Sequence, residues 1–206
     1  MSAQVLNSKF TVGYTIRGSR YLNVTNRCTL RCAFCPKFNG EWTVRDHDLR
    51  LQREPTVDEI VAAVGNPSEY REIVFCGLGE PTLRLDELRE VASRLRGSGV
   101  PRRLNTDGLG SLVHGHDITP ALKGSLEAVC ISLNAQDEDT YNAHCRPKLP
   151  GSYAALLDFT LRARDAVPEV TLTAIDGLAG VDIVACEEIA ANLGVKFRRR
   201  VLDVVG

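Results

Sequence analysis

Short apolar runs alternate with amphipathic helical patterns along most of this 206-residue chain. The runs that predict strands cover residues 10–16, 21–25, 73–76, 103–106, 128–133, 170–175 and 195–202. Between them, apolar residues recur at helical spacing over residues 56–64, 88–97, 118–123, 152–161 and 182–194. Strands that are separated by helical crossovers pair in parallel. The alternation therefore predicts an α/β fold in which helices cover a mostly parallel sheet.

The predicted repeat is too short to close a full barrel. Residues 17–20 join the first two apolar runs and include a glycine, which predicts a β-hairpin. The pattern contains about six strand–helix units, whereas eight close a TIM barrel. We therefore predict a partial (β/α)6 TIM-like barrel with an N-terminal β-hairpin. One domain over residues 1–206 would contain the hairpin over about 10–26, a loop over 27–54 and β/α units over 55–206.

Capping residues mark several predicted helix ends. Thr56 and Glu59 form the pattern of a capping box. Gly97 is placed to end the helix that begins near residue 88. Ser152 is expected to cap a helix whose inward face carries leucines at positions 156, 157 and 161. The segment over residues 36–54 has no such pattern and predicts a long polar loop.

Composition places the chain among ordinary globular proteins. Hydrophobic residues make up 44% and charged residues 25% of the chain, which is enough to bury a core. The net charge of −1 gives no long-range attraction to nucleic acid or to an anionic membrane. No apolar run approaches the ~18 residues of a membrane span, and residues 1–9 lack the apolar core of a signal peptide. Seven cysteines, clustered early and then scattered, do not resemble a disulfide framework, so we expect a cytoplasmic protein.

Three cysteines stand close together directly after the second predicted strand. Cys28, Cys32 and Cys35 have the spacing C-x3-C-x2-C. Iron–sulfur cubes are normally held by four thiolates, so three thiolates suggest a cube with one iron open to another ligand. The same logic separates open catalytic zinc sites from closed structural ones. The motif therefore predicts a redox enzyme.

Polar clusters follow the next three predicted strands as well. These clusters are residues 77–81, residues 105–108 and residues 132–134. In α/β folds of this kind the site lies beyond the carboxyl ends of the strands. The cysteines and the three clusters are therefore expected to share one rim of the sheet.

The motifs together resemble those of the radical S-adenosylmethionine (SAM) superfamily. The three-cysteine spacing with Phe34 before the third cysteine is the signature. Residues 75–83, 104–108, 131–135 and 145–147 also resemble the subgroup found beside TatD-type nucleases. The resemblance implies an iron-dependent oxidoreductase that uses a [4Fe–4S] cluster on the three cysteines and SAM as cofactors. In that superfamily the open iron binds the amino and carboxylate groups of SAM, and one electron releases methionine and a 5′-deoxyadenosyl radical.

The resemblance implies cofactor contacts close to the cysteines. Gly77 and Gly79 would let the backbone approach the methionine part of SAM, and Glu80 would accept a hydrogen bond from the SAM ammonium. An ordinary strand-ending turn is the alternative for this segment. Phe34 would offer its backbone carbonyl to the adenine amino group, while its ring packs over the cluster.

Further contacts are implied on the later strands. Thr106, Ser132 and Asn134 are candidate ligands for the SAM carboxylate or ribose hydroxyls, and strand-end capping is the alternative. Asn105 is a further candidate for cofactor binding, with orientation of the neighbouring loop as the alternative. Arg146 is a candidate partner for a SAM carboxylate or a substrate anion, beside an ordinary surface salt bridge.

Other reactive side chains have weaker assignments. Cys145 is a candidate catalytic residue, as a hydrogen donor or a covalent handle for substrate, whereas Cys76, Cys130 and Cys186 are expected to pack in the core.

The segment over residues 107–117, which carries His114 and His116, predicts a mobile substrate loop more than a metal site. In the run over residues 198–200, strand alternation sends Arg199 to the face opposite its neighbours. One of the three arginines is a candidate for binding a substrate phosphate, but solvated surface charge is the default interpretation.

The leading hypothesis is a radical SAM enzyme that abstracts hydrogen from a small molecule or a nucleotide. An activase-like enzyme that acts on a partner protein stays open, as do a structural zinc module and a pure iron–sulfur electron carrier. Expected partners are a reductant such as flavodoxin or ferredoxin and, through the subgroup, a functional link to a TatD-type nuclease. No membrane partner is expected.

Overall fold

Seven strands form one curved sheet in the order β1-β2-β5-β6-β7-β8-β9. The computed structural model describes residues 10–201. The strands are β1 Gly13–Ile16, β2 Ser19–Asn23, β5 Ile73–Cys76, β6 Arg102–Thr106, β7 Ala128–Ser132, β8 Glu169–Asp176 and β9 Lys196–Val201. β1 pairs antiparallel with β2, and every later pair is parallel. The predicted hairpin and partial barrel are confirmed.

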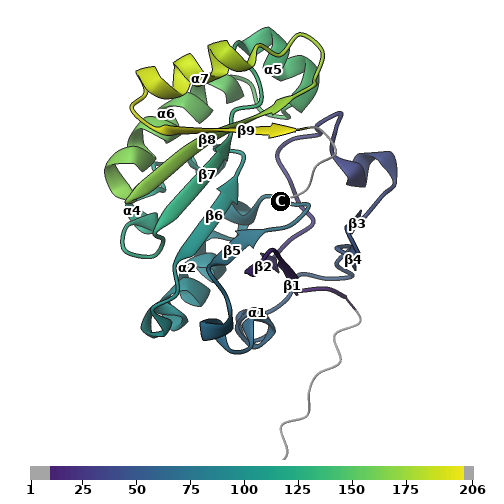
Figure 1. Cartoon of the computed structure of the whole chain (residues 1–206), viewed down its shortest axis with the longest axis vertical. Coiled ribbons are helices and arrows are strands. Elements are labelled where there is room, and N and C mark those ends of the chain that lie inside the picture. The colour runs from purple at the N-terminus through teal and green to yellow at the C-terminus, as the bar shows by residue number, and fades with distance from the viewer. Residues whose placement is uncertain (1–9, 202–206) are drawn as a thin grey trace, which may run out of the picture.

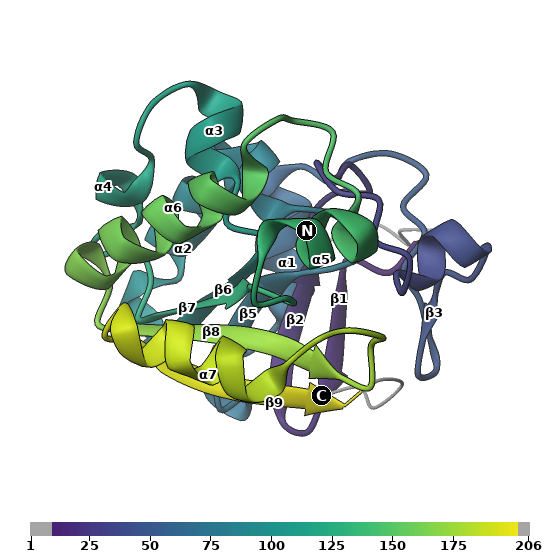
Figure 2. The ribbon, with the colours of Figure 1, turned by 90° about the horizontal axis from the view of Figure 1, so that it is seen from above.

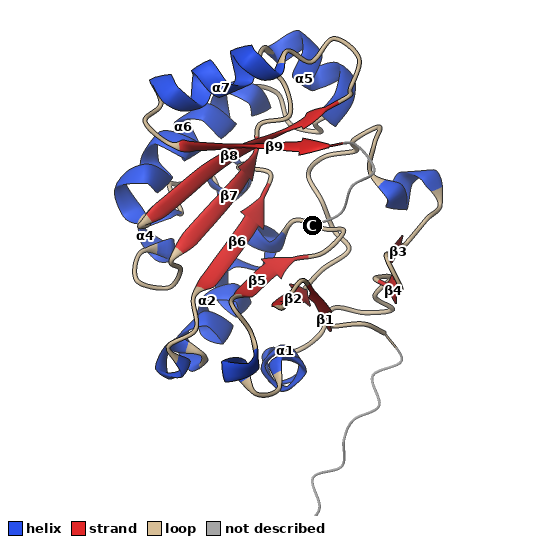
Figure 3. Cartoon of the chain, viewed as in Figure 1, coloured by secondary structure: helices blue, strands red, loops and turns tan. Residues whose placement is uncertain are grey.

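Helices cover the convex side of this sheet (Figure 1). They are α1 Val57–Val64, α2 Leu85–Arg94, α3 Gly110–His114, α4 Thr119–Leu122, α5 Glu138–Cys145, α6 Ser152–Ala166 and α7 Ile183–Asn192. Figure 2 shows α6 and α7 along β8 and β9. The concave side faces a segment that carries two short strands, β3 Thr43–Val44 and β4 His47–Asp48 (Figure 3). Within residues 10–201, no helix has the length and apolar character needed to cross a membrane.

Alternate residues of each strand divide between a convex core and a concave polar face. Phe75, Leu104, Ile131 and Leu172 are fully buried in the main core under the helices. Their neighbours along the strands point to the other face because side chains alternate in a strand. The concave face therefore carries the polar and sulfur-containing side chains, which are Glu72, Cys76, Arg103, Asn105, Cys130, Ser132, Thr171 and Thr173.

The capping pattern at α1 is present as predicted. The Thr56 hydroxyl accepts from the Glu59 N–H at 3.2 Å, and the Glu59 carboxylate accepts from the Thr56 N–H at 2.8 Å. Gly97, in contrast, does not end α2. That helix ends at Arg94, and Gly97 lies in a short 3-10 turn over Arg96–Ser98.

The predicted cap of α6 was wrong, and its predicted inward face was right for Leu156 and Leu157, which packs against the core, but not for Leu161. The N-cap is Gly151, and the Ser152 hydroxyl instead donates to the Leu149 carbonyl at 2.7 Å. Of the three predicted inward leucines only Leu156 is buried, and Leu161 is 37% exposed. The buried stripe is instead completed by residues three, four and seven positions after Leu156, which are Phe159, Thr160 and Ala163.

The segment over residues 36–54 is more ordered than a polar loop. It contains a 3-10 helix over Pro36–Asn39 and the β3–β4 hairpin. Leu49 and Leu51 are buried, and amide groups hold both backbones. Asn23 donates to the Leu49 carbonyl at 2.9 Å, and Asn26 donates to the Leu51 carbonyl at 2.6 Å. Asparagine side chains at and just after the end of β2 thus hold the chain that follows the β3–β4 hairpin.

Candidate functional site

The three predicted ligand cysteines lie on one loop at the carboxyl end of β2. Cys28, Cys32 and Cys35 are all free and partly exposed. Cys28, Cys32 and Phe34 pack against the main core, and the Cys35 N–H donates to the Cys32 carbonyl at 3.1 Å. We call residues 26–35 the cysteine loop. It presents three soft sulfur donors, partly shielded by apolar side chains, which suits iron.

The cysteine loop is fastened to the end of α5. Backbone and side-chain donors join the two segments without any apolar contact being needed. The bonds are Arg31 N–H to Cys145 carbonyl at 3.0 Å, Ala33 N–H to His144 carbonyl at 2.8 Å, Lys148 N–H to Thr29 carbonyl at 3.1 Å, and Lys148 Nζ to Cys28 carbonyl at 3.1 Å. The positions of the cysteines are therefore set by a segment more than a hundred residues further along the chain.

Burial keeps protons on two of these thiols. It raises the pKa of Cys28 to about 12, and the nearby charges of Asp107 and Glu80 act in the same direction. The Cys32 thiol donates to the Cys145 thiol, which raises the pKa of Cys32, and burial raises it further. A metal ligand must be the thiolate, so iron has to displace these protons when it binds.

Glu80 lies beneath the cysteine loop and is only 3% exposed. Its Oε1 accepts from the Thr82 N–H at 2.9 Å, from the Thr82 hydroxyl at 2.6 Å and from the Thr106 hydroxyl at 2.8 Å. Its Oε2 accepts from the Asp107 N–H at 2.7 Å. Glu80 and Thr106 thus join the ends of β5 and β6. The predicted contact of the Glu80 carboxylate with the SAM ammonium stays a prediction.

Asp107 continues this network to the cysteine loop. It is buried, its Oδ1 accepts from the Leu109 N–H at 3.0 Å, and the Thr29 hydroxyl donates to its Oδ2. Burial and the neighbouring Glu80 charge raise the pKa of Asp107 well above its usual range. No role was predicted for Asp107, although it stands in one of the polar clusters after a strand.

Gly77 and Gly79 allow close backbone contact, but with β2 and the cysteine loop. Gly77 has φ +117°, and a Cβ there would lie 2.3 Å from Asn23 Oδ1. A Cβ on Gly79 would lie 2.1 Å from the Thr25 carbonyl oxygen and 2.6 Å from that of Arg27. Their approach to the methionine part of SAM stays a prediction beside this observed packing. The glycines let residues 77–80 clamp the start of the cysteine loop.

Two buried polar atoms behind the cysteine loop have no partner in residues 10–201. Asn134, with φ +61°, donates to Cys145 Sγ at 3.6 Å, but its Oδ1 is unsatisfied. The Tyr141 hydroxyl is also unsatisfied, and burial, with Cys145 and Asp107 nearby, raises the pKa of Tyr141. Buried polar atoms are rarely left unpaired. These two atoms therefore fit a site that a polar ligand completes.

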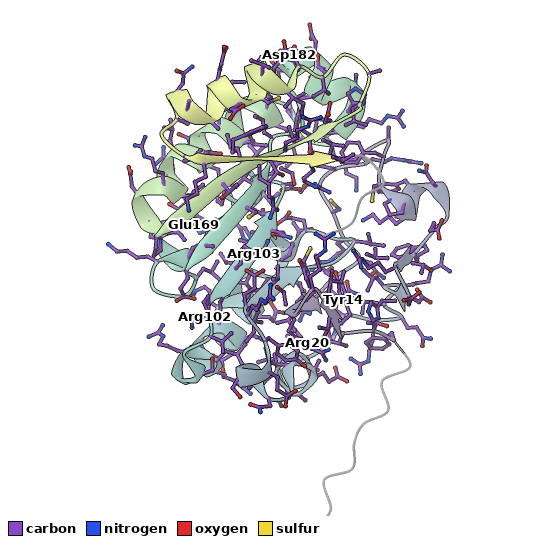
Figure 4. All side chains as sticks on the ribbon, viewed as in Figure 1. Tyr14, Arg20, Arg102, Arg103, Glu169 and Asp182 are labelled. Atoms are coloured by element: carbon purple, nitrogen blue, oxygen red, sulfur yellow. The ribbon has the colours of Figure 1, made fainter. Side chains whose placement is uncertain are left out.

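The concave face holds a second network of polar side chains. Asn105 donates from Nδ2 to Cys76 Sγ at 3.3 Å and accepts from Arg103, which orients it toward the strands instead of a loop. Arg103 also pairs with Glu72 through two contacts of 2.8 Å. The hydroxyl of Tyr14 faces Cys76, and burial and Cys76 raise its pKa (Figure 4). Cys76 is thus half-buried among polar groups, contrary to the predicted core packing.

Two predicted site residues do not line the concave face. Arg146 is exposed and forms the left-handed C-cap of α5 with φ +48°, beside an outer hollow of about 640 Å³. Cys145 is 0% exposed and contacts Cys32, so it does not present a thiol on an open rim. Ser132 lies half-buried at the end of β7, as expected. Cys130 and Cys186 are buried, as predicted.

The two histidines do not form a metal site. His114 Nε2 lies 2.8 Å from the Thr82 carbonyl, and His116 Nδ1 lies 3.0 Å from the His114 carbonyl. The segment expected to be a mobile loop contains α3, and Asp107, Leu109 and Gly110 are buried. The polar and glycine-rich composition concealed this short helix.

No three or more His, Cys, Asp or Glu side chains in the described part of the chain converge on one position for a single metal ion. A tetrahedral zinc site needs such convergence, with ligands about 2.0–2.3 Å from the ion. An iron–sulfur cube is held by thiolates on separate irons, so its ligands can stand further apart. The three thiols on one shielded loop thus fit a cube better than zinc.

Comparison with known proteins agrees with this fold and cysteine loop. A GTP 3',8-cyclase of Corynebacterium glutamicum is 28% identical over 183 residues, which cover 86% of this chain and 47% of that protein. The chain thus spans about half the length of this relative.

Solved structures support the fold. SuiB of Streptococcus suis bound to S-adenosylmethionine has a TM-score of 0.65 at 11% identity, covering 90% of this chain and 40% of that chain. TYW1 with a lysine-pyruvate adduct has a TM-score of 0.63 at 16% identity, covering 91% of this chain and 66% of that chain.

The fold and the site define an α/β protein with a partial barrel and a three-cysteine loop at its carboxyl rim. The family model described as the Radical SAM superfamily matches residues 22–193, and the chain belongs to this superfamily of enzymes. The cofactors of the family are a [4Fe–4S] cluster and S-adenosylmethionine.

Proposed function

We propose that this chain is the catalytic core of a radical SAM enzyme that abstracts hydrogen from a nucleotide or another small molecule. The observation that carries the proposal is the cysteine loop, in which three free thiols stand at the carboxyl end of β2 in a chain of this superfamily. When bound, the cluster and SAM supply one electron and a 5′-deoxyadenosyl radical, with methionine as the leaving group.

The residues of the chain position these cofactors. Cys28, Cys32 and Cys35 would hold the cluster as thiolates, fastened by the hydrogen bonds to the end of α5. The Glu80–Asp107 pair would support the loop from below, because Thr29 beside Cys28 donates to Asp107.

Polar atoms behind and beside the loop are the proposed SAM contacts. The unsatisfied Asn134 Oδ1 would accept from a ribose hydroxyl or the ammonium, and Ser132 lies at the adjacent strand end. The carbonyl of Phe34 stays the proposed adenine partner. Arg146 would contact cofactor only from outside the sheet, so we propose no SAM contact for it.

The substrate class follows from the relatives in part. The matching relatives are enzymes whose name gives GTP as substrate, which supports a nucleotide over a partner protein. The TatD-associated subgroup, with its functional link to a nuclease, also points to nucleic-acid chemistry. We further propose a flavodoxin or ferredoxin as reductant and a cytoplasmic location.

The test is anaerobic reconstitution with iron and sulfide, followed by SAM and dithionite. We expect a brown protein that forms 5′-deoxyadenosine, and no product from the Cys32→Ala variant. Deuterated nucleotides added to the assay should then transfer deuterium into 5′-deoxyadenosine. A wild-type protein with about four irons that forms no 5′-deoxyadenosine would refute the proposal.

A further inference from the structure

The last strand places two arginines on the concave face of the sheet. On β9, Phe197 packs against the main core and Arg199 pairs with Asp176, so both lie on the convex side. Because side chains alternate, Arg198 and Arg200 project to the concave side. The parallel register with β8 agrees, since it aligns them with concave-face residues of that strand. We call these two residues the β9 arginines.

The β9 arginines leave the concave face with an excess of positive charge. Two ion pairs lie on this face, Arg103 with Glu72 at 2.8 Å and Lys196 with Glu169 at 2.5 Å. Arg198 lies close enough to Glu72 to help Arg103 lower the pKa of that carboxyl group. Neither of the β9 arginines forms an ion pair within residues 10–201. The whole chain carries a net charge of only −1, so this excess of two positive charges is a local feature.

Arg200 extends toward the cysteine loop. Its side chain is accessible from the concave space, yet neighbouring groups crowd the guanidinium. Partial burial lowers the pKa of Arg200, and the like charge of Arg198 lowers it too, while Cys76 and Cys32 lie close enough to oppose them. A guanidinium stays charged at any pH a protein survives. Both β9 arginines are exposed, so their guanidinium groups are open to an anion that binds from the concave side.

The number and shape of these donors favour a phosphate over a carboxylate. Residues two positions apart in a strand lie on the same face with Cα atoms about 6.6 Å apart. The guanidinium groups of Arg198 and Arg200 can therefore bind one polyphosphate together. Each fork matches phosphate oxygens in a bidentate manner. A di- or triphosphate brings at least two negative charges, which equals the local excess, whereas one carboxylate brings a single charge.

We propose that Arg198 and Arg200 bind the phosphate groups of the substrate, which makes that substrate a phosphorylated compound such as a nucleoside polyphosphate. The inference rests on the proposed function and deepens it. Phosphates held on β9 would leave the rest of the molecule to extend across the concave face toward Cys76 and the cysteine loop. The arginines are binding residues and take no part in breaking bonds.

The test measures pyrophosphate binding by calorimetry on the reconstituted protein. Wild-type protein should bind pyrophosphate and bind malonate, a dicarboxylate, at least tenfold more weakly. The double variant Arg198→Gln/Arg200→Gln should lose at least tenfold in pyrophosphate affinity. The matched control is Arg199→Gln, which removes the same charge from the opposite face of the same strand and should change affinity less than twofold.

Additional variants and outcomes make the test decisive. Arg198→Lys and Arg200→Lys keep the charge but lose the fork, so each should bind with intermediate affinity. Circular dichroism and thermal unfolding show whether the variants are folded. Equal binding by the wild type, the double variant and the Arg199→Gln control would overturn the proposal, as would equal affinity for malonate and pyrophosphate.

The same preparations separate this inference from the proposed function. If 5′-deoxyadenosine forms and pyrophosphate binding does not depend on the β9 arginines, the inference fails and the radical function stands. If no 5′-deoxyadenosine forms but binding depends on the arginines, the anion site stands and the radical function fails.

Discussion

The polar groups at the two ends of the sheet differ in whether they have partners within the described residues. At the β2 end, Glu80 and Asp107 are buried, and both carboxyl groups are hydrogen-bonded within the chain. At the β9 end, Arg198 and Arg200 form no ion pair within residues 10–201. Buried carboxyl groups need such partners, whereas the exposed guanidinium groups of the β9 arginines are left to water or to a bound anion. The difference indicates that the chain preorganises its cofactor end and leaves its substrate end to be completed by the substrate.

The largest effect is expected when one of the predicted cluster ligands is removed from the cofactor end. Cys32→Ala removes one of three thiolates, and two thiolates are a poor clamp for a cube. We expect iron content after reconstitution to fall from about four per chain to nearly none, measured by iron analysis and visible absorption.

The matched control is Cys186→Ala, which removes a buried thiol from the core side of α7. It should lower stability but keep the full iron content. Retention of the cluster by the Cys32→Ala variant would show that this cysteine is not a ligand.

A second change breaks the packing beneath the cysteine loop. A Cβ on Gly79 would overlap two backbone carbonyls, those of Thr25 and Arg27, which cannot rotate away. Gly79→Ala should cost about 1–3 kcal/mol or more in urea unfolding and should weaken cluster loading. Gly97→Ala is the control, because nothing lies within 4 Å of its Cβ. That variant should be as stable as the wild type or more so.

Much of the fold could be predicted from local patterns. The run over residues 73–76 predicted β5 with its observed ends, and the Thr56–Glu59 pattern predicted the start of α1. These features depend on neighbouring residues only. The prediction failed for α3 and α5, which are short and rich in polar residues. Their apolar contacts are made with distant segments, which periodicity does not reveal.

The candidate site was predicted in position but not in its contacts. The cysteine loop and the polar clusters do lie at one rim of the sheet, because parallel strands place their carboxyl ends together. The Thr106 and Asp107 donors to Glu80, however, and the backbone against which Gly79 packs come from segments 26 or more residues away. Motif spacing cannot distinguish a carboxylate that faces ligand from one that joins two strands. The contact between Cys32 and Cys145 was hidden for the same reason.

The third prediction tests how much the Glu80 carboxylate at the cofactor end contributes to stability. Glu80→Gln keeps the shape but replaces one acceptor oxygen with an amide that can only donate. At least one of the present donors would then face another donor, at a cost of about 1–3 kcal/mol in urea unfolding. Glu90→Gln changes an exposed partner of Arg94 and should have little effect. Equal stability of the two variants would contradict the supporting role of Glu80.

The fourth prediction concerns the pH dependence of stability. The folded pKa of Asp107 is raised by burial and by Glu80, above an unfolded value of about 3.9. The folded protein then holds a proton that the unfolded chain has released, so stability falls as pH rises from about 4 toward the folded pKa. Asp107→Asn cannot ionise and should flatten that part of the curve.

The control is a carboxyl group whose pKa is shifted in the opposite direction. The Thr140 N–H and the Thr140 hydroxyl lower the pKa of Asp137, the N-cap of α5. Its contribution is present above the unfolded pKa and is lost as pH falls. Asp137→Asn should therefore flatten the acid limb of the curve and leave the neutral limb unchanged. Identical pH profiles for wild type and Asp107→Asn would exclude a neutral Asp107.

The smallest expected effect lies at the β9 end. Arg200→Gln removes a charge that has no ion pair in the described residues and that Arg198 repels. Stability in urea should change by less than about 0.5 kcal/mol or rise, because no favourable contact is lost. The same variant should weaken pyrophosphate binding, so stability and binding would respond in opposite directions. That combination is expected of a residue kept for its ligand. A stability loss as large as that of Glu80→Gln would instead make Arg200 a structural residue, and the contrast between the two ends of the sheet would disappear.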